Sequence, residues 1–356
     1  MKRVGYIYEK IYDIDNIKNA IRKSSKGKRN RKHVVKILNN IDYYALKIQK
    51  MLINKNYIPS PYTVKKIVDG SSNKIREIYK PKYYPDQIIH WALILQTEKI
   101  FMKGMYNYTC GSVKGRGAGL GKKMICRWLD NDYRGTKYCL KMDVSKYYPS
   151  IDNNILKLML RKHIKDKNCL WLFDIIIDSN KNGLPIGNYT SQWLANFFLQ
   201  DLDHYIKEQL KVKYFIRYID DIVILGSNKR KLHKVCRGID EFLAKINLKI
   251  KGDWQIYPVN NRAIDFLGYR FFRDKTILRG RNSLRIRRRI NKISKKNYLN
   301  RRDSSAIISY WGWIKSSDSY NFYKKYIKPK INIGKAKEVI STYDRKTNNL
   351  CRNSNL

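Results

Sequence analysis

The chain has 356 residues, of which 43% are hydrophobic and 13% aromatic, so it can build packed cores and is not a disordered chain. Its 75 Lys and Arg against 29 Asp and Glu give a net charge of +46, which predicts nucleic acid as the partner unless a Lys-rich proteome alone explains it. Without an 18-residue apolar run, an apolar N-terminal leader or a CxxC pair, we expect a cytoplasmic protein that has no membrane partner, zinc site or disulfide framework.

The first 110 residues form a basic segment followed by one with a mostly helical pattern. Residues 1–36 hold twelve Lys or Arg, densest over Lys26–Lys32. This run fits a solvated helix face and an arm that grips a nucleic-acid backbone equally well. Between residues 37 and 110 the helical pattern is interrupted by a predicted hairpin from Val64 to Tyr79, with its turn at 69–73.

A glycine-dense loop at 111–121 follows. It has neither the GxxxxGK[ST] phosphate loop nor a GxGxxG motif in a nucleotide-domain context, so it gives no support to a P-loop or Rossmann enzyme. The pattern after it predicts, in order, a helix near 119–134, a strand near 137–144, helices over 153–179, a loop at 183–187 and an amphipathic segment over 190–210.

The strongest hairpin pattern in the chain runs from Tyr214 to Leu225, with Asp220 and Asp221 at its centre. A helix near 229–246 and a strand pair near 254–273 are predicted next. Residues 273–300 then hold eleven Lys or Arg and one Asp, and a helical tail rich in Trp and Tyr completes the chain.

Three aspartates stand out because the chain has only 23 Asp and 6 Glu. Asp143 is predicted to end a strand, and Asp220 and Asp221 interrupt a β-branched run in which aspartate is disfavoured. A simple turn would favour Asn-Gly or Asp-Gly, and neither is present. Clustered carboxylates in so basic a chain are most simply compensated by divalent cations, which points to two-metal phosphoryl chemistry.

Over about residues 60–325 the order of motifs resembles a reverse transcriptase. Asp143-Val144-Ser145-Lys146-Tyr147-Tyr148 is similar to the first palm motif, and Tyr218-Ile219-Asp220-Asp221 to the YxDD box. Phe266-Leu267-Gly268-Tyr269 resembles the primer-grip hairpin, and Lys74 with Arg76 the fingers pair that meets the incoming triphosphate.

The resemblance implies an α+β, right-hand polymerase fold. It divides the chain into a basic N-terminal region with fingers (1–110), a palm (111–272) and a thumb with a basic tail (273–356). It also implies catalysis by Asp143, Asp220 and Asp221, with two Mg²⁺ ions, or Mn²⁺, held by these residues and Val144. The implied partners are an RNA template, a DNA or RNA primer, the cDNA product and dNTPs.

The loop Leu184-Pro185-Ile186-Gly187-Asn188-Tyr189-Thr190-Ser191-Gln192 departs from the usual family pattern, which has glutamine where this chain has Ile186. This version resembles the reverse transcriptases of diversity-generating retroelements, which copy a dedicated RNA with errors at adenines and can work with a small accessory protein. The alternative is a defence-associated bacterial reverse transcriptase acting with a non-coding RNA. A remote alternative is a non-catalytic RNA-binding scaffold.

Further residues are candidates for binding. The resemblance assigns Ile186 and Gly187 to the nucleotide site, with Tyr148 under the sugar, where it would exclude a 2′-hydroxyl; strand-end packing is the other interpretation of Tyr148. Lys249 and Lys251 are candidates for protonating the leaving pyrophosphate, and the sequence does not choose between them. Basic side chains expected to contact nucleic acid are Arg116, Arg285, Arg287, Arg288 and Arg289, the last four on a predicted helix with an apolar stripe of Leu284, Ile286, Ile290 and Ile293.

Overall fold

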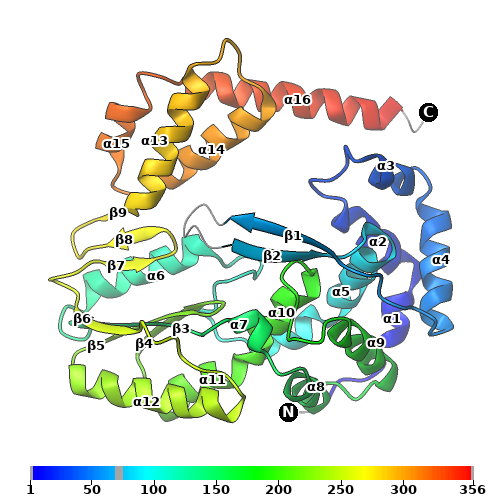
Figure 1. The fold of residues 1–356 in the computed structure, drawn as a ribbon, viewed down its shortest axis with the longest axis horizontal. Coiled ribbons are helices and arrows are strands. Elements are labelled where there is room, and N and C mark those ends of the chain that lie inside the picture. The colour runs from blue at the N-terminus through cyan, green and yellow to red at the C-terminus, as the bar shows by residue number, and fades with distance from the viewer. Residues whose placement is uncertain (1–2, 69–74, 354–356) are drawn as a thin grey trace. The chain divides into compact units, whose positions relative to one another are not determined.

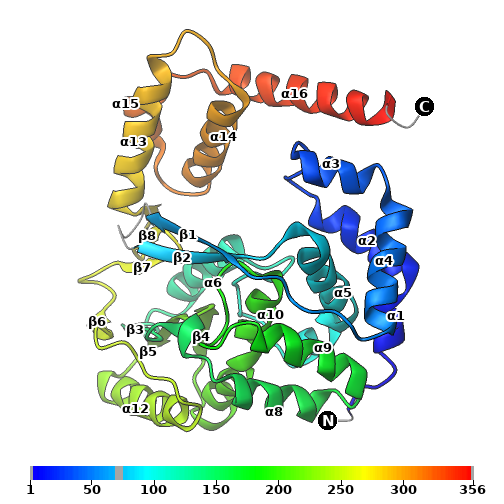
Figure 2. The same cartoon turned by 45° about the vertical axis from the view of Figure 1, so that its right-hand side comes forward.

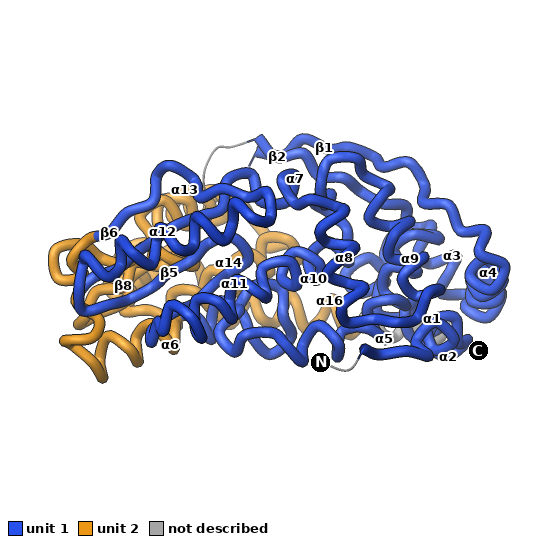
Figure 3. The backbone as a smooth tube through the Cα atoms, turned by 90° about the horizontal axis from the view of Figure 1, so that it is seen from below, with its two compact units in different colours: residues 1–121, 138–256 blue, residues 122–137, 257–356 orange. Residues whose placement is uncertain are grey.

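The computed structural model describes residues 3–68 and 75–353. The chain divides into two compact units (Figure 3). Unit 1 comprises residues 1–121 and 138–256, and unit 2 comprises residues 122–137 and 257–356. Helices combine with antiparallel sheets, so the expected α+β class is confirmed. The domain bounds drawn from the sequence stay a prediction.

Unit 1 begins with helices that bury apolar faces and leave their basic residues outside. Asp13 caps α2 by accepting from the backbone N–H groups of Asp15 and Asn16, and Ile17 and Ile21 are fully buried on the inner face. In the basic cluster after α2, Lys28 donates to the side chain of Gln87 at 2.5 Å. The helices are α1 (Tyr8–Tyr12), α2 (Ile14–Ser24), α3 (Lys32–Leu38), α4 (Ile41–Ile53) and α5 (Ile88–Lys103), with a π-helical turn η1 (Tyr83–Gln87) before α5.

The predicted hairpin near residues 64–79 is present as β1 (Thr63–Val68) and β2 (Ile75–Lys80), seen from two sides in Figures 1 and 2. Every residue of β1 is exposed. The predicted turn residues 69–73 and the predicted site residue Lys74 lie outside the described residues.

The central sheet of unit 1 carries the aspartates. It has the strand order β4-β5-β3-β6, and β5 pairs antiparallel with both β3 and β4. Most residues of its middle strands are buried, and α12 packs against β3 and β5 (Figure 1). The strands are β3 (Tyr138–Asp143), β4 (Tyr214–Tyr218), β5 (Asp221–Gly226) and β6 (Gln255–Pro258), within which the division between the units falls.

Helices connect these strands in the order that the sequence predicts. Asp152 and Asp166 cap α8 and α9, each accepting from two backbone N–H groups. The connecting elements are α6 (Ala118–Asn131), α7 (Tyr147–Ser150), α8 (Asn153–His163), α9 (Lys167–Asp178), α10 (Tyr189–Phe198), α11 (Gln200–His204), η2 (Tyr205–Gln209) and α12 (Lys229–Lys245).

Unit 2 combines a small sheet with helices. The sheet is antiparallel in the order β7-β8-β9, from β7 (Ile264–Phe266), β8 (Tyr269–Phe271) and β9 (Thr276–Leu278). The sequence pattern does not predict the third strand, because three residues are too few to show a period. The helices are α13 (Gly280–Ser294), α14 (Arg301–Lys315), α15 (Tyr320–Tyr326) and α16 (Ile333–Asn353).

The apolar stripe predicted for α13 is correct except at one residue. Ile286, Ile290 and Ile293 are at most 1% exposed, whereas Leu284 is 37% exposed. The reason is geometric, since a residue two positions before Ile286 lies about 200° around the helix from it. Throughout the described ranges, no helix combines the length and the apolarity that a membrane crossing requires.

Candidate active site

A cleft with a volume of ≈ 690 Å³ lies entirely within unit 1 and collects most of the predicted catalytic and nucleotide-binding residues. Its walls come from β2, the end of β3 with the following turn, the loop before α10 and the β4–β5 turn. The predicted residues that line it are Arg76, Asp143, Val144, Tyr148, Ile186, Asp220 and Lys251.

The carboxylates are positioned by the strand register. Asp143 is the last residue of β3 and lies opposite Asp221, the first residue of β5. Asp220 occupies a two-residue turn with Ile219, so the predicted turn contains one of the two adjacent aspartates rather than both. Backbone hydrogen bonds fix the ends: Val144 N donates to Asp220 O at 3.3 Å, and Lys251 N donates to Asp143 O at 2.8 Å.

The environment of Asp220 favours its neutral form. Burial and the adjacent Asp143 carboxylate raise the pKa of Asp220 to about 7, against the opposing influence of Arg76. Two carboxylates forced together in a partly buried cleft repel each other when both are ionised. A divalent cation would relieve that repulsion, so the pair fits the oxygen ligands that Mg²⁺ and Mn²⁺ prefer.

Asp221 does not line this cleft. Its Oδ1 lies 3.9 Å from Lys141 Nζ, which is on the same sheet. Across the described part of the chain, no group of three or more His, Cys, Asp and Glu side chains forms a metal-binding cluster. The structure therefore brings Asp143 and Asp220 together, and the metal-binding roles of all four predicted ligands stay predictions.

The two tyrosines after Asp143 have different environments. Tyr147 is 3% exposed and donates its hydroxyl to Ala195 O at 2.5 Å, so it is a core residue. Tyr148 is half-buried and lines the cleft, where burial and the charge of Asp220 raise its pKa and keep its hydroxyl protonated. Packing alone therefore accounts for the first tyrosine, and the second faces the site.

The loop before α10 is attached to the β1–β2 hairpin at one point. Tyr79 N donates to Ile186 O at 2.8 Å, and a Cβ on Gly187, which has a φ of +134°, would meet Tyr79 O at 2.2 Å. Glycine is required there because the two backbones approach so closely. Ile186 lines the cleft, whereas Gly187 acts through this contact.

Several site features escape the sequence pattern. Glu77, Asn180 and Asn182 also line the cleft. Of the two candidate lysines, Lys251 lines the cleft and pairs with Asp253, while Lys249 is exposed and is not a lining residue. A fully buried ion pair, Asp203 with Arg217, lies behind the catalytic turn. The arginine inside a β-branched strand was the available signal, because a buried charge needs a partner.

The predicted primer-grip residues form the β7–β8 hairpin of unit 2. Leu267 and Gly268, with φ values of 54° and 84°, make its two-residue turn. Phe266 is fully buried and Tyr269 is 6% exposed, with the Tyr269 hydroxyl 2.7 Å from the Ser316 hydroxyl. These two rings are therefore packed inside unit 2, and the primer-grip role of the hairpin stays a prediction.

The predicted basic contacts are not equivalent. Arg116 lies in the glycine-dense loop and donates to Tyr106 O, just before that loop, at 2.6 Å. On α13, Arg285, Arg287 and Arg288 are exposed. Arg289 is half-buried and donates to Asp303, which is 1% exposed and also pairs with Lys296. Arg289 therefore neutralises a buried carboxylate of its own unit, which competes with a role on nucleic acid.

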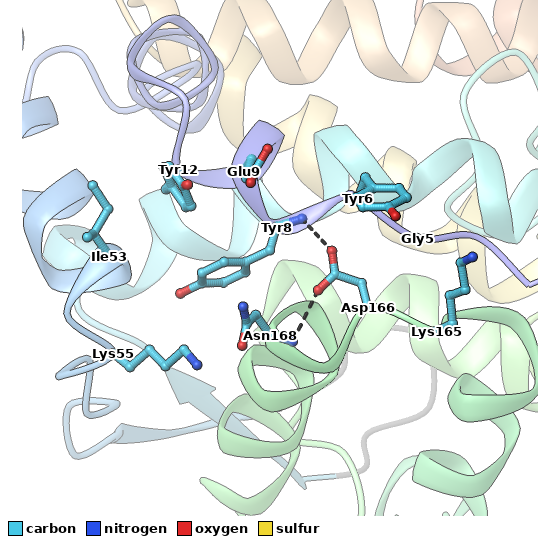
Figure 4. A pocket seen from close by; sticks show the side chains of 10 residues that line it. All are labelled: Gly5, Tyr6, Tyr8, Glu9, Tyr12, Ile53, Lys55, Lys165, Asp166 and Asn168. Carbon is cyan, nitrogen blue, oxygen red and sulfur yellow. Dashed lines mark hydrogen bonds between the residues drawn. The ribbon is translucent and has the colours of Figure 1, made fainter.

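A second cavity of unit 1, with a volume of ≈ 440 Å³, lies beside the N-terminal segment (Figure 4). Asp166 connects the segments around it: its Oδ2 accepts from the backbone N–H groups of Ile7 and Tyr8, and its Oδ1 caps α9. Asp143 and Asp220 line the first cleft and not this one.

Comparisons with known proteins indicate the same class of enzyme as the residues of the cleft. Residues 96–271 match the family model of reverse transcriptase (RNA-dependent DNA polymerase). Over 270 residues the chain is 26% identical to the retron Ec73 reverse transcriptase of Escherichia coli, covering 70% of this chain and 81% of that protein. It is 21% identical over 272 residues to protein YkfC of Escherichia coli K12, covering 63% and 70%. The solved apo telomerase of Candida tropicalis is similar with a TM-score of 0.46 and 12% identity, covering 65% and 59%.

A sheet-borne pair of carboxylates in a cleft with Arg76 and Tyr148, in a chain with this family match, defines a nucleotidyltransferase. More particularly, residues 96–271 match the reverse transcriptase family, and the enzyme is an RNA-directed DNA polymerase. The right-hand arrangement that its motifs imply stays a prediction.

Proposed function

We propose that the cleft around Asp143 and Asp220 is the polymerisation site, at which a primer 3′-hydroxyl attacks a dNTP chosen by an RNA template. One observation carries the proposal: residues from four separate segments, to which the resemblance assigns metal, triphosphate, sugar and base contacts, line one cleft of ≈ 690 Å³. A nucleotide is of suitable size for such a volume.

Each side chain then has a role. Arg76 binds the triphosphate, Tyr148 lies under the sugar and excludes a 2′-hydroxyl, and Ile186 borders the base pair. Asp143 and Asp220 hold the divalent cations, with Asp221 and Val144 as further ligands. When bound, these cations supply activation of the attacking hydroxyl and neutralisation of the leaving pyrophosphate. Lys251, rather than Lys249, donates the proton to the leaving group, because it alone of the two lines the cleft.

Primer extension on an RNA template, with each Asp replaced in turn, tests the site. We expect Asp143→Asn or Asp220→Asn to lower dNTP incorporation at least ~10³-fold, because metal ligation needs anionic oxygens. RNA affinity should stay within about twofold, because phosphate binding depends on the basic residues. Asp178→Asn, on α9 outside the cleft, is the matched control. Near wild-type extension by either cleft variant contradicts the assignment.

The finer proposal is that the polymerase is error-prone and belongs to a diversity-generating retroelement, copying a dedicated structured RNA. Ile186 supports it, since an apolar side chain at the edge of the cleft cannot hydrogen-bond a nucleotide and should discriminate less against mispairs. Ile186→Gln should therefore lower errors opposite template adenine more than opposite the other bases. Each 1.4 kcal/mol of added discrimination lowers the error frequency about tenfold, which sequencing of the products detects.

The second candidate is a defence-associated reverse transcriptase acting with a non-coding RNA, which the similarity to a retron reverse transcriptase favours. The two roles differ in fidelity. If wild-type and Ile186→Gln products carry the same low error at every template base, the retroelement role is wrong and the defence role takes its place. Sequencing the RNA that copurifies with the chain then identifies the template.

A further inference from the structure

The two-residue turn that carries Asp220 has a backbone conformation that its sequence disfavours. Ile219 has a φ of 58°, in the left-handed region, where a β-branched residue is strained by roughly 1–3 kcal/mol. The usual residues for such a position are Gly, Asn and Asp. Something outside the turn must therefore hold Ile219 in place, and with it the carboxylate of the next residue.

The holding contact comes from Arg217, which is fully buried two residues before the turn. Its Nη1 donates to Ile219 O at 2.7 Å. The same guanidinium donates from Nε to Asp203 Oδ1 at 2.7 Å and from Nη2 to Asp203 Oδ2 at 2.5 Å. Its two remaining N–H groups point at Asn196, at 3.3 Å and 3.4 Å. All five guanidinium donors thus have acceptors, so the arm that reaches Ile219 cannot rotate away.

The other partners of the cluster fix it to the rest of unit 1. Asp203 also accepts from the Thr109 hydroxyl at 3.0 Å, and Asn196 donates to Gly111 O at 2.6 Å. Gly111 contacts the turn as well, because a Cβ there would lie 2.5 Å from Ile219 Cδ1 and 2.9 Å from Ile219 N. Arg217 therefore holds the Ile219 carbonyl, and Gly111 packs against the Ile219 side chain.

We propose that Arg217, oriented by Asp203 and Asn196, is a positioning residue for catalysis: it clamps the Ile219 carbonyl and thereby aims Asp220 at Asp143. The proposal rests on the assignment of Asp220 to the polymerisation site. A lysine at 217 keeps the buried positive charge beside Asp203, but one ammonium lacks the planar fork that serves Asp203, Asn196 and Ile219 together.

The test compares Arg217→Lys with Arg161→Lys. Arg161 also forms a two-pronged pair, with Asp174, and does so between α8 and α9 away from the cleft. Four quantities are measured for each variant: kcat with saturating dNTP, KM for dNTP, the Mg²⁺ concentration at half-maximal rate, and the rise in melting temperature on adding Mn²⁺.

For Arg217→Lys we expect a cooperatively folded protein whose kcat falls about 10- to 100-fold, as for a misplacement of about 1 Å, with KM nearly unchanged. The half-saturating Mg²⁺ concentration should rise several-fold and the Mn²⁺-dependent rise in melting temperature should shrink. Arg161→Lys should match the wild type in all four quantities. A folded Arg217→Lys enzyme with wild-type kcat and metal response overturns the proposal.

If Arg217→Lys does not fold, Gly111→Ala displaces the same turn without touching the ion pair, and unchanged kcat in that variant overturns the proposal. Asp220→Asn separates the two levels of inference. If Asp220→Asn is active, the assignment of Asp220 to the polymerisation site is wrong. If Asp220→Asn is inactive but Arg217→Lys and Gly111→Ala have normal activity, only the positioning role of Arg217 is wrong.

Discussion

Two carboxylate clusters of unit 1 lie on either side of the same turn and are built in opposite ways. Asp203 is fully buried, and both of its carboxylate oxygens accept hydrogen bonds, from Arg217 and Thr109. Asp220 lies beside a second carboxylate, Asp143, and burial together with this neighbouring charge raises its pKa. The fold thus matches the charge of Asp203 internally, whereas the charge of the Asp143 and Asp220 pair is left for the divalent cations that we propose.

Removing one negative charge should therefore change the free energy of unfolding very differently at Asp203 and at Asp143. Asp203→Ala leaves the Arg217 guanidinium buried without its counter-ion, which should lower the free energy of unfolding by about 3–5 kcal/mol. Asp143→Asn removes one of two repelling anions and should cost nothing of that size. Urea unfolding of both variants measures the contrast. Equal losses would mean that Asp143 is also a structural counter-ion.

The pH dependence of stability should follow the raised pKa of Asp220. Because the folded protein holds this proton more tightly than the unfolded chain, stability falls as pH rises from about 4 to about 7, and the loss is complete above pH 7. Asp220→Asn should abolish this component and be more stable than the wild type at pH 8, by roughly 1–3 kcal/mol. Thermal unfolding between pH 5 and pH 8 is the measurement, and parallel curves for the two proteins would show that folding does not raise the pKa of Asp220.

The same distinction between paired and exposed charge applies on α13. Arg288 is exposed, and Arg289 pairs with the buried Asp303. We expect Arg288→Ala to reduce the slope of log affinity for RNA against log salt concentration by up to ~0.9, with stability unchanged. Arg289→Ala should leave that slope alone and lower the melting temperature. Filter binding across a salt series, with a melting curve for each variant, decides between them, and the reverse pattern would place Asp303 outside the packing of unit 2.

The sequence predicts the catalytic sheet well because its signals are local. A β-branched run interrupted by Asp220 and Asp221, and a strand ending at Asp143, are visible within ten residues each. The cleft itself also follows from motif order, down to Tyr148 and Ile186. These features depend on short segments whose residue types are unusual for their place.

What the sequence could not provide depends on pairing between distant segments. Asp203 lies on α11 and has no pattern that marks it as the partner of Arg217, although the arginine in an apolar strand predicts that some partner exists. The choice of Lys251 over Lys249 likewise depends on the direction of each side chain. The exposure of Leu284 was calculable, since helical periodicity places it opposite Ile286.

We propose that Asp143 and Asp220 form a site whose excess negative charge is neutralised by a divalent cation. The most direct measurement is the melting temperature of the wild type and of Asp220→Asn at pH 8, with and without Mg²⁺. Without the ion, the wild type should melt below the variant. With millimolar Mg²⁺, the wild type alone should gain stability and the order should reverse. Equal responses to Mg²⁺ in the two proteins would contradict the account.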